Sequence, residues 1–448
     1  MKRFLYNTVT FTLFLILLPF LPFLFLFSKK RRANMLHRLG WIHLISDKKP
    51  NTKRIWIHAL SVGEVKSALP LINAIKAKYF NMLDINYELI ITASTKTGFD
   101  MATELFLGSK SAISDGVQVG YFPFDFSFSV KSISSKIEPD LVIIVESDLW
   151  PQFLWYMNRK KIPVFLVNAR LSQSSFNGYR RFSTIFAPIF CMFEKIMVQT
   201  EMDKERFLKI GVPENRVVVT GNIKFDQPIP SKDTINKSLE LLGNLKNFDK
   251  RYIIAGSTHE GEEEIIASIF KDLKKNLDFS NISLIIAPRD PKRASDINKM
   301  FNAKGFKSRL VSDKKGSIAE IDVVVVDKMG ILASLYSICD IAFVGGSLVP
   351  FRGHNPLEPA LFSKPVVFGQ YTDDFKEITE TMLSNNAAFR VKDKNDLLET
   401  IFMLLKDKEL ASRVGQNGYN LVIDGRGAVD RVLSLIKRLS VIPLKNSI

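Results

Sequence analysis

Short apolar runs alternate with longer amphipathic stretches along most of the chain. Four runs rich in β-branched residues predict buried strands at 55–60, 88–92, 141–145 and 164–167. Continuously apolar runs of this length suit parallel strands that are covered on both faces. Segments with helical periodicity lie between them, as at 65–79. This alternation predicts the βαβ units of a doubly wound α/β fold.

A second series of apolar runs predicts another sheet. Its strands are expected at 252–255, 283–286, 323–326, 341–344 and 365–368. The polar stretch 226–250, with two prolines and many charges, predicts a linker between the two series. We therefore expect two Rossmann-like domains, at 34–225 and 226–448. Sheets of this kind bind ligands beyond the carboxyl ends of their strands, so we expect the active site in an interdomain cleft.

The first 33 residues follow a different pattern. Residues 4–27 are almost wholly apolar and uncharged, which suits the ~20 residues of a membrane-spanning helix. The basic run 29–32 is denser than the two cations before the segment, so the rest of the chain is expected on the cytoplasmic side. We expect residues 1–33 to anchor the protein in the inner membrane. Pro19 and Pro22 also allow a shallow insertion instead of a full span.

The net charge narrows the choice of partners. Lys and Arg outnumber Asp and Glu by 62 to 46, which favours an anionic membrane surface or a phosphorylated substrate. No helix-turn-helix, zinc-finger or RNA-binding motif is present, so nucleic acid is not expected as a partner. The two cysteines and five scattered histidines predict neither a disulfide framework nor a metal site.

Two loops that follow predicted strands carry candidate functional residues. In the loop Ser61-Val62-Gly63-Glu64, Gly63 permits a tight turn and Glu64 begins the next helix. Glu64 either complements the dipole of that helix or faces the cleft as a general base. In the loop 256–264, Ser257 and Thr258 either leave backbone N–H groups open to an anion or simply cap the following helix.

The loop 345–360 is the most informative. Core packing asks for none of its polar and flexible residues, which favours a binding role. A helix is expected near Pro356 with Asn355 as its cap. That arrangement points free amides and a helix dipole at an anion, with Glu358 one turn in, within reach of a ribose. The other candidates in the loop are Gly346, Ser347, Gly353 and His354.

Two further stretches, 146–151 and 288–293, also leave predicted strands. The second is basic. It either binds phosphate, for which the arginine fork of Arg289 is suited, or it is a solvated run of charges.

Taken together, these loops resemble those of the Kdo (3-deoxy-D-manno-octulosonic acid) transferases of lipopolysaccharide synthesis. The resemblance extends over nearly the whole chain after the apolar segment, and its blocks stand in the order that the family shows. They are 56–59, 61–64, 146–151, 168–172 with 178–179, 221–226, 255–264, 288–289 and 353–359.

The resemblance implies a GT-B fold and a reaction without metal or other cofactor. The C-terminal domain would bind CMP-Kdo and the N-terminal domain a lipid A precursor such as lipid IVA. Glu64 would deprotonate an acceptor hydroxyl, which attacks the anomeric carbon of Kdo with inversion as CMP leaves. Implied donor residues are Lys224, Ser257, Thr258, Pro288, Arg289, Gly346, Ser347, Gly353, His354, Asn355 and Glu358. Implied acceptor-side residues are Ser61, Gly63, Glu146 and Arg170.

Two positions depart from the family pattern. Asp290 stands where a histidine is usual, and Arg352 stands where a glycine is common. A carboxylate near the nucleotide would disfavour nucleotide binding unless it points away or pairs with Lys292 or Arg293. Two other functions remain open: a GT-B enzyme that uses a UDP- or GDP-sugar, and a catalytically inactive, membrane-tethered binding protein.

Overall fold

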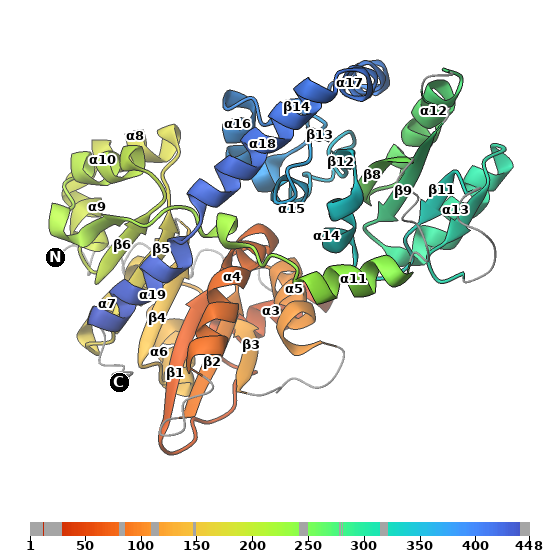
Figure 1. The fold of residues 1–448 in the computed structure, drawn as a ribbon. Helices are drawn as coiled ribbons and strands as arrows, with labels where there is room; N and C mark the ends of the chain where they lie inside the picture. Colours follow the sequence, from red (N-terminus) through yellow and green to blue (C-terminus); the bar gives the residue numbers. More distant parts are fainter. Residues whose placement is uncertain are drawn as a thin grey trace, which may run out of the picture. The chain divides into compact units, whose positions relative to one another are not determined.

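The computed structural model describes residues 29–79, 86–108, 116–146, 149–241, 250–276, 281–313 and 321–439, together with residues 12 and 279 (Figure 1). The chain forms two compact units. The first contains the chain up to Asp226 together with the segment that starts at Arg426. The second runs from Gln227 to Gly425.

The first unit is built on a seven-stranded sheet with the strand order β3-β2-β1-β4-β5-β6-β7, and all its pairings are parallel. Its strands are β1 (Thr52–His58), β2 (Asn86–Ala93), β3 (Val117–Tyr121), β4 (Leu141–Val145), β5 (Val164–Ala169), β6 (Lys195–Val198) and β7 (Val217–Val219). Its helices are α3 (Lys29–Leu39), α4 (Val62–Tyr79), α5 (Lys96–Leu107), α6 (Ser127–Ile137), α7 (Pro151–Arg159), α8 (Gln173–Arg181), α9 (Ser183–Phe190), α10 (Glu201–Ile210), α19 (Ala428–Leu439), and the short η2 (Glu214–Arg216) and η3 (Ile223–Asp226).

Apolar side chains cover both faces of this sheet. Successive residues of a strand point to opposite faces, and the core follows that rule. Ile55 and Ile57 of β1 belong to the cluster that includes α4, α5 and α19. Trp56 between them belongs to the cluster that includes α6, α7, α9 and α10. The runs in the sequence are therefore continuously apolar because the strands are covered on both faces, as predicted.

The second unit repeats the architecture with the strand order β10-β11-β9-β8-β12-β13-β14, again with parallel pairings throughout. Its strands are β8 (Arg251–Thr258), β9 (Ile282–Pro288), β10 (Ser308–Leu310), β11 (Val323–Val325), β12 (Ile341–Val344), β13 (Val366–Phe368) and β14 (Ala388–Arg390). Its helices are α11 (Lys232–Leu241), α12 (Glu262–Lys274), α13 (Ala294–Ala303), α14 (Leu332–Leu335), α15 (Leu357–Ala360), α16 (Lys376–Ser384), α17 (Lys394–Lys406), α18 (Lys408–Gly425), and the short η5 (Pro291–Arg293), η7 (Tyr336–Ile338) and η8 (Asp373–Phe375).

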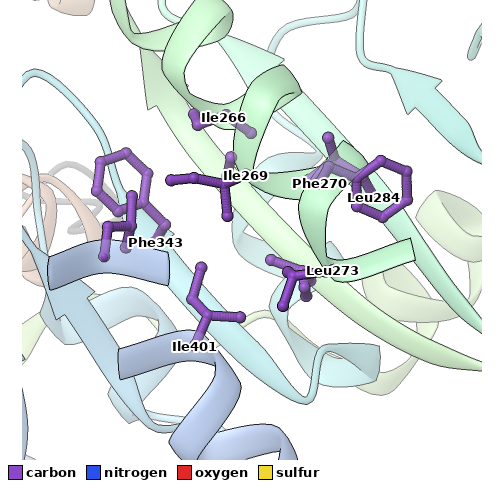
Figure 2. Close-up of a pocket in the computed structure, with 10 residues that line it drawn as sticks. Ile266, Ile269, Phe270, Leu273, Leu284, Phe343 and Ile401 are labelled. Atoms are coloured by element: carbon purple, nitrogen blue, oxygen red, sulfur yellow. The ribbon is translucent and has the colours of Figure 1, made fainter. Parts of the chain in front are cut away.

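A small cavity of about 10 Å³ lies in the core of the second unit. Figure 2 shows Ile269 and Leu273 of α12 facing Ile401 of α17 and Phe343 of β12 across it. Every residue that lines the cavity is apolar. A cavity of this size and polarity offers a ligand nothing to bind, so it is a packing void of the core.

The sequence predictions for the sheets are confirmed. All nine predicted runs fall in strands of the two parallel sheets. Strands β3, β6, β7, β10 and β14 were not predicted. They have three to five residues each, which is too short for a clear periodic signal.

The structure divides the chain differently from the expected domains 34–225 and 226–448. Helix α19, the last blue helix in Figure 1, belongs to the first unit. Val429, Val432, Leu433 and Ile436 lie on one side of α19 and pack into the core cluster of the first unit. Because this apolar stripe needs a sheet face to cover, the chain returns to the unit where it began.

The predicted linker is also partly helical. Residues 232–241 form α11, and Leu239 of this helix packs against the core of the second unit. The periodic apolar positions of this segment are few, which explains why its polar composition suggested a linker.

The carboxylate of Asp226 fixes the place where the chain returns. Its Oδ1 accepts a hydrogen bond from the amide of Gly427 at 2.6 Å, and its Oδ2 accepts one from the amide of Val429 at 2.7 Å. Arg431 donates from Nε to the carbonyl oxygen of Thr220 at 2.8 Å. The last residue of the block 221–226 therefore caps α19, although the two lie about two hundred positions apart.

The predicted membrane anchor at 1–33 lies outside the described residues, apart from residues 12 and 29–33. Among the residues that the structure does describe, none belongs to a helix long and apolar enough to span a bilayer.

We predict that Asp226→Ala lowers the free energy of unfolding of the first unit by about 1–2 kcal/mol, because two amides at the start of α19 lose their acceptor. Urea unfolding followed by tryptophan fluorescence measures this change, since all four tryptophans belong to the first unit. Asp233→Ala, at an exposed position of α11, is the control. Equal unfolding midpoints for the two variants would contradict the capping role.

Candidate functional site

In the first unit, the candidate base Glu64 lies in the first turn of α4, beyond the carboxyl end of β1. Its Oε2 accepts a hydrogen bond from the amide of Leu60 at 2.5 Å, and the hydroxyl of Ser61 lies 3.5 Å from Oε1. The side chain is only partly buried. The carboxylate is thus held in place and complements the helix dipole while part of it stays open to solvent. The two interpretations of Glu64 are compatible in this geometry.

Glu146 gathers three further side chains at the same edge of the sheet. It follows β4 with a left-handed backbone (φ 67°). Its Oε1 lies 3.3 Å from Nζ of Lys224 and 3.0 Å from the hydroxyl of Ser67, and its Oε2 lies 3.9 Å from Nε of Arg170. A non-glycine residue in this conformation is strained, and such strain often marks functional sites.

The structure therefore brings Lys224 to the acceptor-side candidates. Lys224 was predicted on the donor side, but it belongs to η3 of the first unit and pairs with Glu146. Both side chains are about 11% exposed, so the pair is weakly screened by water. Ser67 was not predicted. It lies one turn along α4 from Gly63, and its hydroxyl is 2.8 Å from the Gly63 carbonyl oxygen. Helical spacing from Glu64 could have indicated it.

In the second unit, the buried carboxylate of Glu262 occupies the place where substrate was expected. Its Oε2 accepts from the amides of Gly346 (2.7 Å) and His259 (3.0 Å), and its Oε1 accepts from Ser347 and Leu348 (3.0 Å each). The side chain is fully buried. Burial raises the pKa of Glu262, and the four amide bonds lower it in part.

Gly346 and Ser347 were predicted to bind the donor, and the structure shows that the amides of residues 346–348 already donate to Glu262. These amides form a nest for an anion, and the anion is a side chain of the protein. Glu262 stands in the block 256–264 that was singled out, yet as a helix-favouring acid it gave no sign of this role.

Ser347 and the neighbouring glycines shape the loop. The hydroxyl of Ser347 donates to the carbonyl oxygen of Val344 and accepts from the amide of Gly369 at 2.8 Å. Since its amide is also used, Ser347 supports the loop internally and does not face a ligand. Gly353 has φ +74°, and a Cβ there would lie 2.8 Å from the carbonyl oxygen of Tyr371. Only glycine fits this close approach.

Two imidazoles meet above the loop. The Nε2 atoms of His259 and His354 lie 2.8 Å apart, and the rings are parallel within 1°. His259 also stacks on Phe351, with ring centroids 4.1 Å apart. One Nε2 must donate a proton and the other accept it, so the two nitrogens cannot both carry hydrogen in this arrangement. His354 was a candidate, and His259 becomes one through this contact.

Asn355 and Glu358 lie together as predicted, but the helix behind them is short. Asn355 accepts from the amide of Leu357 at 3.1 Å and donates from Nδ2 to Glu358 Oε1 at 3.3 Å. Helix α15 has four residues, with Pro356 at its cap position. The expected helix dipole is therefore that of a single turn, and the first amide is already occupied by Asn355.

Thr258 and Arg289 lie side by side where β8 and β9 end. The amide of Arg289 donates to the carbonyl oxygen of Thr258 at 2.9 Å, beside a bulge at Ser257, and Thr258 pairs with Pro288. The buried hydroxyl of Thr258 has no hydrogen-bond partner among the described residues. Within that same part of the chain, the guanidinium of Arg289 makes no described hydrogen bond or ion pair. The guanidinium of Arg289 is thus available to a ligand, whereas the hydroxyl of Thr258, although unpaired among the described residues, is fully buried.

The two departures from the family pattern have structural explanations. The carboxylate of Asp290 accepts from the amide of Lys292 at 3.0 Å and so caps its own turn, η5. Arg352 has φ +68°, the left-handed region that glycine favours, and its Nε lies 2.8 Å from Asp374 Oδ1. The loop thus keeps a glycine-like backbone despite the arginine.

Across the residues that the structure describes, no cluster of three or more His, Cys, Asp or Glu side chains could hold a metal ion.

We predict that Glu262→Gln destabilises the loop after β12 by on the order of 3 kcal/mol, because an amide NH₂ group would face backbone N–H groups in the buried nest. Hydrogen–deuterium exchange should become faster at residues 346–348.

Glu263→Gln is the matched control. Glu263 is also buried on α12, but it pairs with Arg293 at 2.8 and 3.1 Å instead of the loop. Unchanged exchange at residues 346–348 in Glu262→Gln, or equal acceleration in both variants, would refute the role assigned to Glu262.

Comparison with known proteins supports one family. A family model described as 3-deoxy-D-manno-octulosonic-acid transferase (kdotransferase) matches residues 33–227. A 3-deoxy-D-manno-octulosonic acid transferase of Haemophilus influenzae is 32% identical over 98% of both chains. One of Aquifex aeolicus is 32% identical over 79% of this chain and 87% of the relative. One of Chlamydia pneumoniae is 28% identical over 99% and 97%.

A solved structure shares the fold. The UDP-GlcNAc 2-epimerase of Neisseria meningitidis bound to UDP-GlcNAc superposes with a TM-score of 0.52 at 16% identity, over 86% of this chain and all of the epimerase. At this identity the similarity speaks for the fold alone, and it agrees with the predicted GT-B-type pair of Rossmann-like units. On the sequence matches, the chain belongs to the family of 3-deoxy-D-manno-octulosonic acid transferases, and it is a glycosyltransferase.

Proposed function

We propose that this chain is an inverting transferase that moves Kdo from CMP-Kdo to a lipid A precursor such as lipid IVA. Family membership supports the transfer of Kdo. The observation that carries the proposal is the carboxylate of Glu64, which is fixed by the amide of Leu60 yet remains partly exposed beyond the carboxyl end of β1.

In this proposal Glu64 is the general base. It takes the proton of the acceptor hydroxyl while the hydroxyl oxygen forms a bond to the anomeric carbon of Kdo. The bond from that carbon to the phosphate oxygen breaks, and CMP leaves with the electron pair. Attack from the face opposite to the leaving group inverts the configuration. The hydrogen bond from the Leu60 amide favours the ionised carboxylate, which is the form that a base requires.

The cluster around Glu146 would handle anionic groups of the substrates. Glu146 holds Lys224 at 3.3 Å, and Arg170 lies 3.9 Å from the same carboxylate. A lysine fixed in this way presents its charge in one place with little loss of side-chain entropy on binding. This arrangement suits an acceptor that carries phosphate and a donor that carries a carboxylate.

On the donor side, Arg289 is the best candidate for the phosphate of CMP-Kdo. Arg289 has an uncommitted guanidinium, which makes strong bonds to phosphate oxygens. Thr258 supplies a buried hydroxyl without a partner among the described residues. Glu358, held by Asn355, is placed to accept from ribose hydroxyls. The occupied amides of residues 346–348 are excluded from this role.

We also propose that the protein works at the cytoplasmic face of the inner membrane. The uncharged apolar residues 4–27 and the basic run 29–32 support an N-terminal anchor with the catalytic units in the cytoplasm. An acceptor that is itself a lipid of the inner leaflet would then reach the enzyme by lateral diffusion.

We predict that the detergent-solubilised full chain, given CMP-Kdo generated in situ and a tetra-acylated lipid A precursor, yields products heavier by one or more Kdo units in mass spectrometry. UDP- and GDP-sugars serve as donor controls. Turnover with one of them and none with CMP-Kdo would favour a different GT-B enzyme. No turnover with any donor, beside an active known transferase, would favour an inactive binding protein.

We predict that Glu64→Gln lowers kcat by about 10²–10⁴-fold, as expected for loss of a general base, while CMP still binds. Initial rates and CMP titration by calorimetry measure the two quantities. Glu104→Gln, at an exposed acid on α5, should leave the rate unchanged. A rate within a few-fold of the unaltered protein in Glu64→Gln would remove Glu64 from the mechanism.

A further inference from the structure

Three apolar side chains project into solvent from the loop that follows α3. Trp41 is 62% exposed, Ile42 46% and Leu44 44%. The residues on either side of them, Leu39 and Ile45, are 2% and 7% exposed. The loop is thus anchored in the core at both ends, and its exposed residues alone face outward. Large apolar side chains gathered in this way on a folded surface mark an interaction site.

Hydrogen bonds hold the backbone of this loop in place. The carbonyl oxygen of Gly40 accepts from the hydroxyl of Ser132 on α6 at 2.7 Å, and the amide of Ser46 donates to Gln118 at 2.8 Å. Arg38 donates from Nε to the carbonyl oxygen of Phe122 at 3.0 Å. The exposure of Trp41 is therefore a property of an ordered loop that is held by α6, by β3 and by the residue after β3.

Helix α6 adds an aromatic ring and a cation next to the loop. Phe128 is 39% exposed in the first turn of α6, and Lys131, one turn further, is exposed. Ser132, which binds Gly40, follows Lys131 directly. The ring of Phe128 stacks on Phe126 within 5°, so its orientation is fixed. We call Trp41, Ile42, Leu44 and Phe128 the apolar rim.

The position of the rim in the chain indicates what covers it. Helix α3 begins at Lys29, two positions after the end of the apolar residues 4–27, and its first four residues are all basic. Eleven helical residues span about 16 Å, so Trp41 lies a short distance along the chain from the proposed anchor. Tryptophan prefers the interface of a bilayer, and clustered cations attract anionic lipids.

We propose that the apolar rim inserts into the headgroup region of an anionic phospholipid bilayer and holds the first unit against the membrane. This inference rests on the membrane location proposed above and goes beyond it, since an anchor alone leaves the folded unit free to move away from the surface. A rim held at the interface keeps the first unit, with Glu64 and Glu146, at the membrane surface.

The test uses the full chain in vesicles of anionic phospholipids with brominated acyl chains, which quench tryptophan fluorescence only on close contact. Trp41→Phe should abolish most of the quenching, because Trp56 is fully buried and Trp150 and Trp155 are partly buried. Phe402→Trp, placed in the Trp41→Phe background at an exposed position of α17, should restore the fluorescence without restoring the quenching.

Flotation of the vesicles distinguishes failure of the rim inference from failure of the proposed membrane location. If the unaltered chain floats with the vesicles but Trp41→Phe is quenched as strongly, the rim does not contact lipid and only this inference fails. Shielding of Trp41 from aqueous acrylamide without quenching by bromine would show that a second protein copy covers the rim, which also overturns the inference. If the chain does not float, the proposed membrane location fails as well.

Discussion

Both sheets of this protein are parallel and covered on both faces, and this constraint decides where chemistry can be placed. Inside each sheet, the ladders occupy the backbone groups and apolar side chains fill the space above and below. Polar side chains of the described residues therefore gather mainly where strands end, although the buried pair of Arg54 and Glu88 lies within β1 and β2. In the first unit, Glu64 follows β1 and Glu146 follows β4. In the second unit, Arg289 follows β9 and Gly346 follows β12.

The strands that are buried on both faces were the elements most easily predicted from the sequence. Runs such as 141–145 and 323–326 are continuously apolar because both of their faces are buried, so they were recognised as strands. Short edge strands such as Ala388–Arg390 have too few residues for their periodicity to be recognised in the sequence. The return of α19 was missed because periodicity shows that a helix needs an apolar face to cover but not which unit provides it.

The contacts within the candidate site could likewise be found only from the structure, because they join residues that are far apart in the sequence. The sequence indicated Gly346 and Ser347 as donor-binding candidates, but it did not show that their amides form a nest, and a nest binds any anion of suitable geometry. That the anion is Glu262, from the start of a helix more than eighty residues earlier, depends on the pairing of β8 with β12. Lys224 was likewise assigned to the donor side from its block alone, and its partner Glu146 became visible only when the strand ends met.

The bonds of Asp226 to the start of α19 have a consequence for how the protein folds during its synthesis. The first unit lacks a core helix until the second unit has been synthesised, because Val432 and Leu433 follow that unit in the chain. The second unit is continuous, so all of its strands and helices are available earlier. Domains generally fold as units during synthesis, with the N-terminal one first. We expect the opposite order here: the second unit can fold while the first unit still has one face of its sheet incompletely covered, until α19 has emerged.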